Sequence, residues 1–285
     1  MLLAWHGLQA APVLVLGDDD FGIRLQRPAR RIVSLAPHLT ELVYAAGAGE
    51  KLVAVSAYSD YPEAAKQLPH VGDASNIDLE RLIVLKPDLV LAWKSNISPF
   101  TVERLRRMGI AVWVSETHKL ADIPARLREV GKLAGTDDDA ERAAKKFGQD
   151  LAELQRTANG KTPVTTFIEI WHDPLLSVNG MHIMSEIVTL CGGKNILHDA
   201  KILTPSIGLE TLLQANPQAI IGGGSASSEA DFRRIWVGQQ SIAAVRLGHI
   251  FHLNPDWIQR ATPRILLGAE VICRSLSNVQ KSSHP

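Results

Sequence analysis

Aromatic and polar side chains gather at the ends of the predicted strands of this 285-residue chain. Loops that follow the carboxyl ends of parallel strands often carry ligand contacts. Indole and phenol rings offer flat apolar surface, while carboxylate, imidazole and guanidinium groups offer hydrogen bonds. Together they suit a large, planar, amphiphilic ligand. The predicted ligand-binding residues are His38, Tyr58, Trp93, Trp171, His172, Asp256, Trp257 and Arg260.

Each of these residues has an ordinary alternative role, because a single loop tryptophan or histidine is more often packed or solvated than in contact with a ligand. The sequence lacks the common catalytic and nucleotide-binding motifs that would favour an enzyme. The sequence contains no GxGxxG that opens a helix, no GxxxxGK[ST] and no GxSxG. It also lacks CxxC and HxxxH, the local patterns of zinc sites. We therefore expect a binding protein rather than an enzyme, with no catalytic residue, no catalytic cofactor and no dedicated metal site.

Strands and helices must alternate to place these residues at strand ends. Residues 13–25 have the pattern of a small hairpin, and the apolar run at 31–35 is followed by a helical pattern that ends at Gly47. Such alternation continues in both halves of the chain, which predicts parallel sheets with helices on both faces. The predicted fold class is α/β with two Rossmann-like lobes, an N-terminal lobe at residues 12–120 and a C-terminal lobe at residues 161–282.

The segment between the lobes, residues 121–160, has no strand pattern and is charged and rich in alanine. Apolar residues recur in it at helical spacing. Thr136 precedes three aspartates, which favour a helix N-terminus because they complement the helix dipole. We expect one long, rigid backbone helix, and a ligand cleft between the two lobes that it joins.

One passage occurs twice in the chain, at residues 76–93 and again at residues 206–223. Each copy has Leu-Glu-x-Leu, an apolar run, a proline and a short apolar strand. Glu80 in the first copy corresponds to Glu210 in the second. The repeat predicts the same helix–strand unit in both lobes, with a glutamate in the first turn of each helix, where the helix dipole stabilises a carboxylate.

Charge, the N-terminal residues and the cysteines limit which partners and which cellular compartment the chain can have. The chain has 30 basic residues (Lys and Arg) and 30 acidic residues (Asp and Glu), so its formal net charge is zero. This balance argues against nucleic acid or an anionic membrane as a partner. Residues 1–17 resemble the end of a secretion signal without its basic start; a buried N-terminal strand is the alternative. The two cysteines, Cys191 and Cys273, suggest buried thiols in a cytosolic protein and a disulfide in an exported one.

Several motifs in combination resemble the helical-backbone metal receptors among the periplasmic binding proteins, and within them the cobalamin-binding members of vitamin ABC importers. The wider family also takes siderophores and haem. The likeness extends from about Arg30 to Ser277. The motifs that carry it are RRIVSLAPHLTELVYAAG, SAYSDYP, DLERLIVLKPDLVLAW, LCGGKNI and NPDWIQRATPRILLGAE.

The resemblance implies roles for particular residues. A glutamate on each lobe meets arginines of the permease dimer in the family, and these glutamates match Glu80 and Glu210. The two cysteines match a bridged pair in the cobalamin binders, which implies a disulfide within the second lobe and a periplasmic location. Positions that line the cobalamin site match a further set: Tyr58, Trp93, Asp256, Trp257 and Arg260.

The match fails at two large aromatic positions. The family has tryptophans where this chain has Ala74 and Thr204, and Trp171 is a candidate to replace one of them. Three histidines are additions that could bond a corrin amide or ligate a metal centre, or could be solvated loop residues. They are His38, His172 and His182.

These observations favour a monomeric periplasmic substrate-binding protein that captures cobalamin or a related corrinoid and delivers it to an ABC permease. A receptor for a siderophore, haem or another metal chelate is the alternative within the same class. An enzyme or a cytosolic metal-binding protein on a similar two-lobed fold is the alternative from a different class. A stiff single-helix connector also implies small motions, so release of the ligand would require the permease to separate the lobes.

Overall fold

The computed structural model describes residues 12–73, 76–157, 162–224, 226 and 228–282. The chain forms two compact units. Unit 1 comprises residues 1–116 and 124–146, and unit 2 comprises residues 117–123 and 147–285. Residues 1–11 of the predicted signal segment lie outside the described residues, as does Ala74, while Val13–Leu16 of that segment form a strand, β1.

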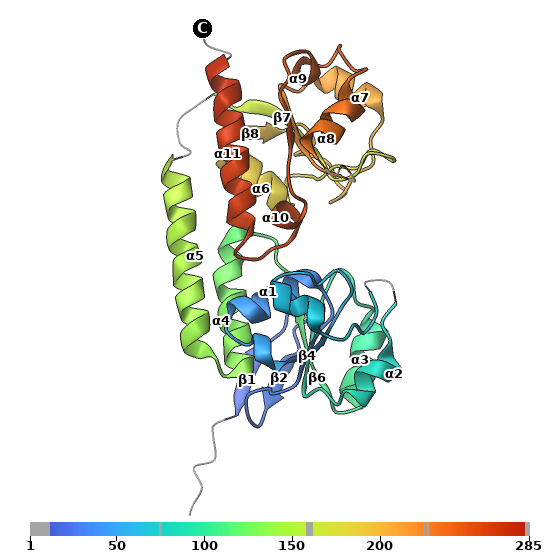
Figure 1. The fold of residues 1–285 in the computed structure, drawn as a ribbon, viewed down its shortest axis with the longest axis vertical. Helices are drawn as coiled ribbons and strands as arrows, with labels where there is room; N and C mark the ends of the chain where they lie inside the picture. Colours follow the sequence, from blue (N-terminus) through green and yellow to red (C-terminus); the bar gives the residue numbers. More distant parts are fainter. Residues whose placement is uncertain (1–11, 74–75, 158–161, 225, 227, 283–285) are drawn as a thin grey trace, which may run out of the picture. The chain divides into compact units, whose positions relative to one another are not determined.

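Unit 1 contains the predicted hairpin and a four-stranded parallel sheet with the order β4-β3-β5-β6 (Figure 1). The hairpin pairs β1 with β2 in antiparallel register, from Val13 opposite Leu25 to Leu16 opposite Gly22. The strands are β1 (Val13–Leu16), β2 (Gly22–Leu25), β3 (Ile32–Ser34), β4 (Leu52–Val55), β5 (Leu89–Trp93) and β6 (Ala111–Ser115).

Helices cover both faces of this sheet. One buried cluster joins alternate residues of the strands to Leu82 of α2 and to Val102 and Leu105 of α3. Pro99 opens α3 after Ser98, whose hydroxyl accepts the backbone N–H of Thr101. The helical elements are α1 (Pro37–Ala45), η1 (Gly49–Lys51), η2 (Glu63–Gln67), α2 (Leu79–Val84) and α3 (Pro99–Arg107).

Unit 2 contains a second parallel sheet, with the order β10-β9-β7-β8. The prediction of a parallel sheet in each half is confirmed. One strand was not predicted, because Gly-Lys-Asn has little strand propensity of its own. It forms by pairing with Val164–Thr166 of the neighbouring strand. The strands are β7 (Val164–Glu169), β8 (Gly193–Asn195), β9 (Ala219–Gly222) and β10 (Ile250–His252).

In unit 2, α6 and α11 lie on one side of the sheet and α7, α8 and α9 on the other (Figure 1). The second side is filled by a cluster that includes Phe167, Phe232 and Trp236, all almost completely buried. The helices are α6 (Ile183–Leu190), α7 (Leu209–Ala215), α8 (Glu229–Trp236), α9 (Ala243–Arg246), α10 (Asp256–Gln259) and α11 (Ile265–Ser282).

Both units have the same strand topology. In each parallel sheet, the strand that comes first in the sequence (β3 or β7) is central, the second lies on one side of it, and the third and fourth lie on the other. The repeated passage forms the same element in both, α2 followed by β5 and α7 followed by β9. Each copy has a left-handed residue just before its proline, Lys86 with φ 47° and Asn216 with φ 42°. The predicted internal repeat is therefore also a structural repeat.

The central segment is helical, as predicted, but it is divided. A short turn, η3 (Leu120–Asp122), leads into α4 (Ile123–Ala134), and α5 (Asp137–Thr157) follows. Gly135 interrupts the expected single helix with φ 69°, a left-handed conformation that glycine adopts without steric cost. The predicted start after Thr136 is confirmed, because α5 begins at Asp137.

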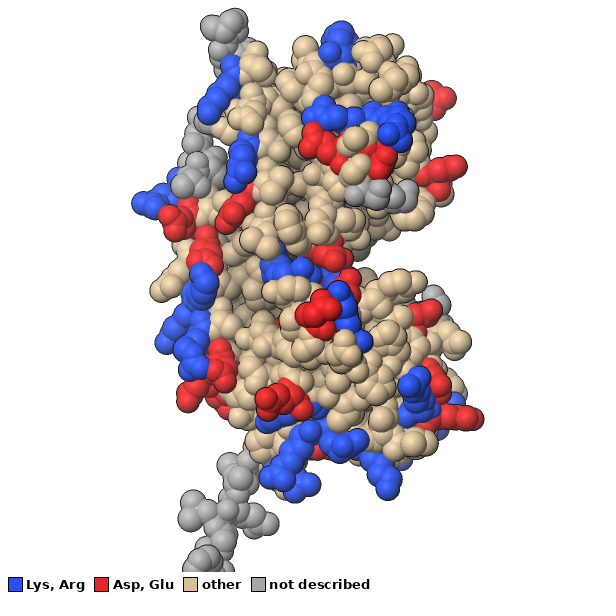
Figure 2. Space-filling model, viewed as in Figure 1, with Lys and Arg blue, Asp and Glu red and all other residues tan. Residues whose placement is uncertain are grey.

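The long helix α5 belongs partly to each unit and is strongly amphipathic. Ala140, Ala144, Phe147 and Leu151 form its buried stripe. On the outer face, charges of opposite sign alternate (Figure 2) and pair within one turn, as in the Glu141–Lys145 ion pair at 3.4 Å. Such pairs each stabilise a helix by a few tenths of a kcal/mol.

A disulfide joins Cys191, just after α6, to Cys273 of α11, and these are the protein's two cysteines. The predicted disulfide within the second lobe is therefore present. Helix α6 and helix α11 pack on the same side of the sheet, so the bond joins neighbouring helices. Among the described residues, the helices are too short or too polar to cross a membrane.

Candidate ligand-binding site

The strand order creates a switch point in each sheet. Connections from the central strand and from the third strand leave in opposite directions, which opens a crevice at their carboxyl ends. In unit 1 this point lies between β3 and β5, and in unit 2 between β7 and β9. Four of the eight predicted ligand-binding residues lie at or after the ends of these strands: His38, Trp93, Trp171 and His172. Tyr58 follows β4, and the other three follow β10, so each unit is described in turn.

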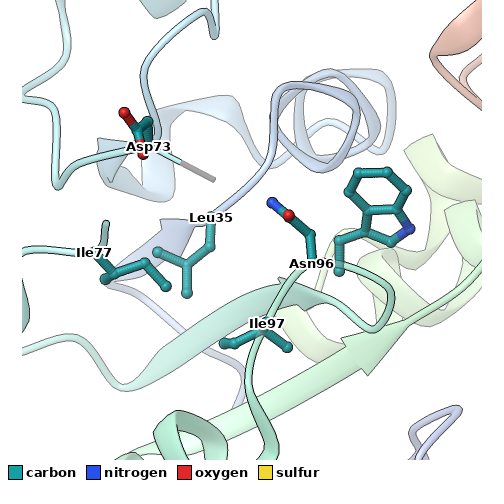
Figure 3. A pocket seen from close by; sticks show the side chains of 6 residues that line it. Leu35, Asp73, Ile77, Asn96 and Ile97 are labelled. Carbon is teal, nitrogen blue, oxygen red and sulfur yellow. The ribbon is translucent and has the colours of Figure 1, made fainter. Parts of the chain in front are cut away.

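A small pocket lies at the switch point of unit 1 (Figure 3). Leu35 follows β3, and Trp93 is the last residue of β5. Figure 3 shows Asp73 and Ile77 on one side of Leu35 and Asn96 on the other. The lining residues are Leu35, Asp73, Ile77, Trp93, Asn96 and Ile97.

The indole of Trp93 is fixed at the edge of this pocket. Its Nε1–H donates to Oε1 of Glu116 at 2.8 Å, and the other carboxylate oxygen accepts the backbone N–H of Ser95 at 2.9 Å. The His38 ring contacts Trp93 edge-on, with ring centroids 5.2 Å apart. The structure therefore brings two predicted residues together, and adds Glu116, which the sequence analysis missed.

Tyr58 occupies an exposed and strained position in unit 1. Its side chain is 77% exposed, and its backbone has φ 65°, a left-handed conformation that is unfavourable for an aromatic residue. Strain of this kind concentrates at functional sites, where surrounding contacts hold the backbone in place.

Buried hydroxyl groups hold the turn that carries Tyr58. The Thr40 hydroxyl oxygen lies 3.0 Å from both Ser34 Oγ and Ser59 Oγ. Ser56 Oγ lies 3.3 Å from Ser59 Oγ, and the Ser59 backbone N–H donates to the Ser56 carbonyl. All four side chains are buried. This network stabilises the turn from beneath and keeps the phenol ring outside the core.

A buried carboxylate marks the switch point of unit 2. Glu169 is the last residue of β7, pairs with Gly222 of β9, and is 1% exposed. Burial raises the pKa of Glu169 to about 7, although the hydrogen bond from Trp236 Nε1 to its Oε2 at 3.0 Å acts in the opposite direction. A Cβ at position 222 would lie 2.2 Å from the Glu169 carbonyl oxygen, so only glycine fits there.

His172 lies against this carboxylate. Its Nδ1 is 3.3 Å from Glu169 Oε1, and its ring meets Trp236 edge-on at a centroid distance of 5.4 Å. Burial lowers the pKa of His172, and the nearby Asp173 carboxylate partly offsets this shift. The side chain is nevertheless 37% exposed. Glu169 was missed by the sequence analysis; the one available signal was a lone glutamate inside the apolar run Phe167–Ile170.

Trp171 precedes His172 and is exposed, with 45% of its surface accessible to solvent. Its Nε1–H donates to the carbonyl of Asp173 at 2.9 Å, which sets the direction of the indole. Thr204, where the resemblance led us to expect a tryptophan, is exposed. The structure therefore leaves Trp171 as an exposed indole at the switch point of unit 2.

The remaining predicted ligand residues lie on α10 or directly after it. Asp256 and Arg260 form an ion pair at 2.8 Å, with the Arg260 side chain 13% exposed and Asp256 32% exposed. Trp257 between them is half-buried. Asp256 and Trp257 lie on α10, which packs against α11, and Arg260 is the residue that follows this short helix.

His182 has a structural contact. Its Nδ1 accepts the backbone N–H of Met184 at 3.2 Å and so caps the N-terminus of α6. Burial, followed by the neighbouring His118, lowers the pKa of His182 to about 4. Its cap therefore depends on a neutral imidazole.

Glu80 and Glu210 occupy equivalent places. Each is the second residue of its helix, α2 or α7, and each is exposed. Asp78 caps α2 by accepting the backbone N–H of Arg81 at 2.9 Å, while α7 begins after Gly208 without a side-chain cap. Their predicted role in docking stays a prediction, as does ligand contact by each residue described above.

Two other features of the described residues bear on where a ligand or a metal ion could bind. A hollow of about 610 Å³ lies beside α3 in unit 1, where Arg106 pairs with Asp19 at 2.8 Å and Arg107 with Glu103 at 2.6 Å. It contains none of the predicted ligand-binding residues. The described residues also contain no group of three or more His, Cys, Asp or Glu side chains that could hold a metal ion.

Residues 32–257 match the family model described as "Periplasmic binding protein". The chain is 39% identical over 256 residues to a vitamin B12-binding protein of Pectobacterium carotovorum, with 89% of this chain and 91% of that protein covered. It is also similar to the crystal structure of the periplasmic vitamin B12 binding protein BtuF of Vibrio cholerae. That likeness has a TM-score of 0.82 and 36% identity, and covers 89% of this chain and 99% of BtuF.

A periplasmic heme-binding protein, RhuT of Roseiflexus sp. RS-1, has the same fold, with a TM-score of 0.78 over 88% of this chain and 99% of RhuT. Its identity of 22% supports a likeness of fold alone. The family model spans most of the chain, and the curated relative matches it over nearly its whole length. The chain therefore belongs to the periplasmic binding protein family.

Proposed function

We propose that this protein is the periplasmic binding component of an ABC importer, and that it captures cobalamin or a related corrinoid. The observation that carries the proposal is its 39% identity, over almost the whole chain, to a vitamin B12-binding protein. Aromatic side chains at both switch points support it, because flat rings suit a planar macrocycle. The predicted ligand cleft between the lobes stays a prediction.

Unit 1 offers Trp93 with His38 at its edge, and the exposed Tyr58. Unit 2 offers Trp171 and His172 on one loop, and Trp257 between the paired Asp256 and Arg260. Because Arg260 is already neutralised by Asp256, we expect this pair to hydrogen-bond uncharged amides rather than to attract an anion. That expectation favours a corrinoid with peripheral amides over an anionic siderophore.

The proposal includes a non-catalytic role and a periplasmic location. The disulfide between Cys191 and Cys273 supports that location, because such bonds persist in oxidising compartments. It also includes an ABC permease as the partner, with a monomeric binding protein that presents one glutamate from each unit.

Titration of the purified protein with cyanocobalamin, haem and ferric siderophores tests the proposal. We expect tryptophan fluorescence to be quenched by cyanocobalamin with saturation at one ligand per chain. A response to haem or to a siderophore, with none to cobalamin, would contradict the proposed ligand while leaving the transport role in place.

The docking role of the glutamates has its own test. Glu80→Ala combined with Glu210→Ala should weaken binding to the permease and lower uptake, while cyanocobalamin affinity stays unchanged. The matched control is Glu103→Ala combined with Glu229→Ala, which also removes one exposed helical glutamate from each unit. Unchanged uptake in the first double variant, or an equal loss in the control, would contradict docking by Glu80 and Glu210.

A further inference from the structure

The Glu169–His172 pair has the geometry of a built ligand site in unit 2. Oε1 of Glu169 and Nδ1 of His172 are both buried, and neither has a well-formed hydrogen bond, although they lie 3.3 Å apart. Buried polar atoms without full partners are uncommon, and each calls for an explanation. A ligand on the outer nitrogen of the imidazole would strengthen the Nδ1–H donor and so shorten this contact.

Two residues hold the imidazole, and they also contact each other. Glu169 lies at Nδ1, the Trp236 ring meets it edge-on, and Trp236 also donates to the other oxygen of the same carboxylate. Since Nδ1 is buried while 37% of the side chain is exposed, the exposed part of the ring is the side away from Nδ1, where Nε2 lies. The pair therefore presents Nε2 outward from a fixed base.

This arrangement determines which nitrogen carries a proton. A carboxylate beside Nδ1 favours the tautomer with hydrogen on Nδ1, which leaves a lone pair on Nε2. A carboxylate that orients a histidine through its second nitrogen is the usual outer support of metal-ligating imidazoles. One nitrogen supplies one ligand, so it suits a metal whose other positions are already filled by a chelating ring.

We propose that His172, positioned by Glu169, coordinates the metal of a bound chelate through Nε2 at an axial position that carries an exchangeable water. The proposal rests on the proposed function. In the step, the bond from the metal to water breaks, water leaves, and the Nε2 lone pair forms the new bond; the metal keeps its oxidation state. Glu169 is a positioning residue that accepts the Nδ1–H.

The space around the pair fits this role. Gly224 belongs to the loop after β9, and a Cβ there would lie 3.4 Å from Glu169 Oε1 and 3.6 Å from the Trp171 Cα. The exposed indole of Trp171 is adjacent in sequence and offers an apolar surface on the same loop. A planar chelate could therefore have its ring against an indole and its metal at an imidazole.

Visible absorption of cobinamide tests the proposal, because its bands report the atoms bound to cobalt. Diaquacobinamide has exchangeable waters, whereas dicyanocobinamide has both axial positions filled by cyanide. We expect the wild-type protein to shift the bands of diaquacobinamide, as nitrogen replaces oxygen, and to bind dicyanocobinamide without a shift. Equilibrium dialysis measures binding of both, and of cyanocobalamin, independently of the spectrum.

Two variants and one control complete the experiment. His172→Gln should bind diaquacobinamide without the shift. Glu169→Gln should also lose it, because Trp236 holds the amide oxygen, so the amide NH₂ faces Nδ1 and the proton moves to Nε2. Its affinity should fall about 10–100-fold, as for other outer supports of metal ligands. His249→Gln, which lies just before β10 at the amino-terminal end of the strands of the same sheet, should retain the wild-type shift.

The outcomes separate the two proposals. If the wild-type protein binds diaquacobinamide without a spectral shift, or if His172→Gln keeps the shift, axial coordination is overturned while the proposed function stands. If dialysis shows no binding of any corrinoid to wild-type protein, the proposed function fails and the coordination falls with it. Thermal unfolding of each variant confirms that a lost shift is not a loss of folding.

Discussion

Leu35 of unit 1 and Glu169 of unit 2 occupy equivalent places in two sheets of the same topology. Ile32 pairs with Leu89, and Thr166 pairs with Ala219, which is the repeat equivalent of Leu89. Counting three residues onward from Ile32 and Thr166 gives Leu35 and Glu169. One unit has an apolar side chain at its switch point and the other has a buried carboxylate.

The difference shows that a repeated backbone does not fix the chemistry of its site. Leu35 needs only apolar neighbours and lines a small pocket with Trp93. Glu169 needs partners, and Trp236 and His172 are arranged around it. Unit 1 therefore provides an aromatic and apolar surface, whereas unit 2 provides a polar group with a defined direction.

The largest expected effect concerns the disulfide, which unit 2 has and the described part of unit 1 lacks. Cys191→Ser combined with Cys273→Ser should destabilise unit 2 by about 4 kcal/mol, because the bond closes a long loop in the unfolded chain. Hydrogen exchange resolved by peptide measures this. We expect faster exchange in β7–β10 and unchanged exchange in β3–β6; equal acceleration in both sheets would contradict an effect confined to unit 2.

A direct exchange of the equivalent residues should have the next largest effect. Leu35→Glu places in unit 1 a carboxylate without the partners that Glu169 has, and should destabilise the protein by about 3 kcal/mol at neutral pH. Leu35→Met, which keeps an apolar side chain of similar volume, is the control and should cost less than about 1.5 kcal/mol. Urea unfolding measures both. Similar losses would mean that packing, rather than charge, separates the two sites.

The helices that follow the central strands, α1 after β3 and α6 after β7, should differ at their N-termini in their response to pH. Helix α1 begins with Pro37 after Ala36 and has no side-chain cap, whereas His182 caps α6. The pKa of His182 is about 4, below its ordinary 6.5, so its contribution is present above pH 6.5 and is lost as the pH falls from 6.5 towards 4. Wild-type protein should lose roughly 1–2 kcal/mol of stability from this group between pH 7.5 and pH 5.

His182→Asn tests that response, since asparagine caps helices without titrating. Thermal unfolding at pH 7.5 and pH 5 should show a smaller pH-dependent loss in the variant than in wild-type protein. If both lose the same amount, the titrating group lies elsewhere.

The left-handed residues that follow α2 and α7, Lys86 and Asn216, include the smallest expected effect, which is at Lys86. Asn216 tolerates this conformation, and its Oδ1 accepts the backbone N–H of Ala243 at 2.8 Å. Asn216→Lys should therefore cost about 1–2 kcal/mol, and Lys86→Asn should stabilise unit 1 by about 0.5 kcal/mol. Urea unfolding of both variants checks the opposite signs. Destabilisation by Lys86→Asn would show that lysine is held there by contacts of its own.

Much of the fold could be predicted because its determinants are local. Apolar runs, prolines and glycines identified the hairpin, most of the strands and the ends of the helices, and the repeat identified equivalent elements. Strand β8 could not be predicted, since Gly193–Asn195 becomes a strand only by pairing with β7. The division of the central helix depended on one glycine, Gly135, inside a long helical pattern.

The candidate site was predicted only in part. Residues placed after strand ends were recognisable by type, and His38 with Trp93 are indeed neighbours. The partners that orient them, Glu116 and Glu169, come from distant parts of the chain or from inside a strand. A single glutamate in an apolar strand indicates a buried charge that needs a partner. The sequence does not show that Trp236, 67 residues later, is that partner.

The covalent bond between Cys191 and Cys273 has a further consequence for handling the protein. A protease that cuts one peptide bond anywhere between these two cysteines leaves two fragments that remain attached. The nicked molecule would migrate as an intact chain on a non-reducing gel and as two bands after reduction. A cut in unit 1 would separate the fragments under either condition.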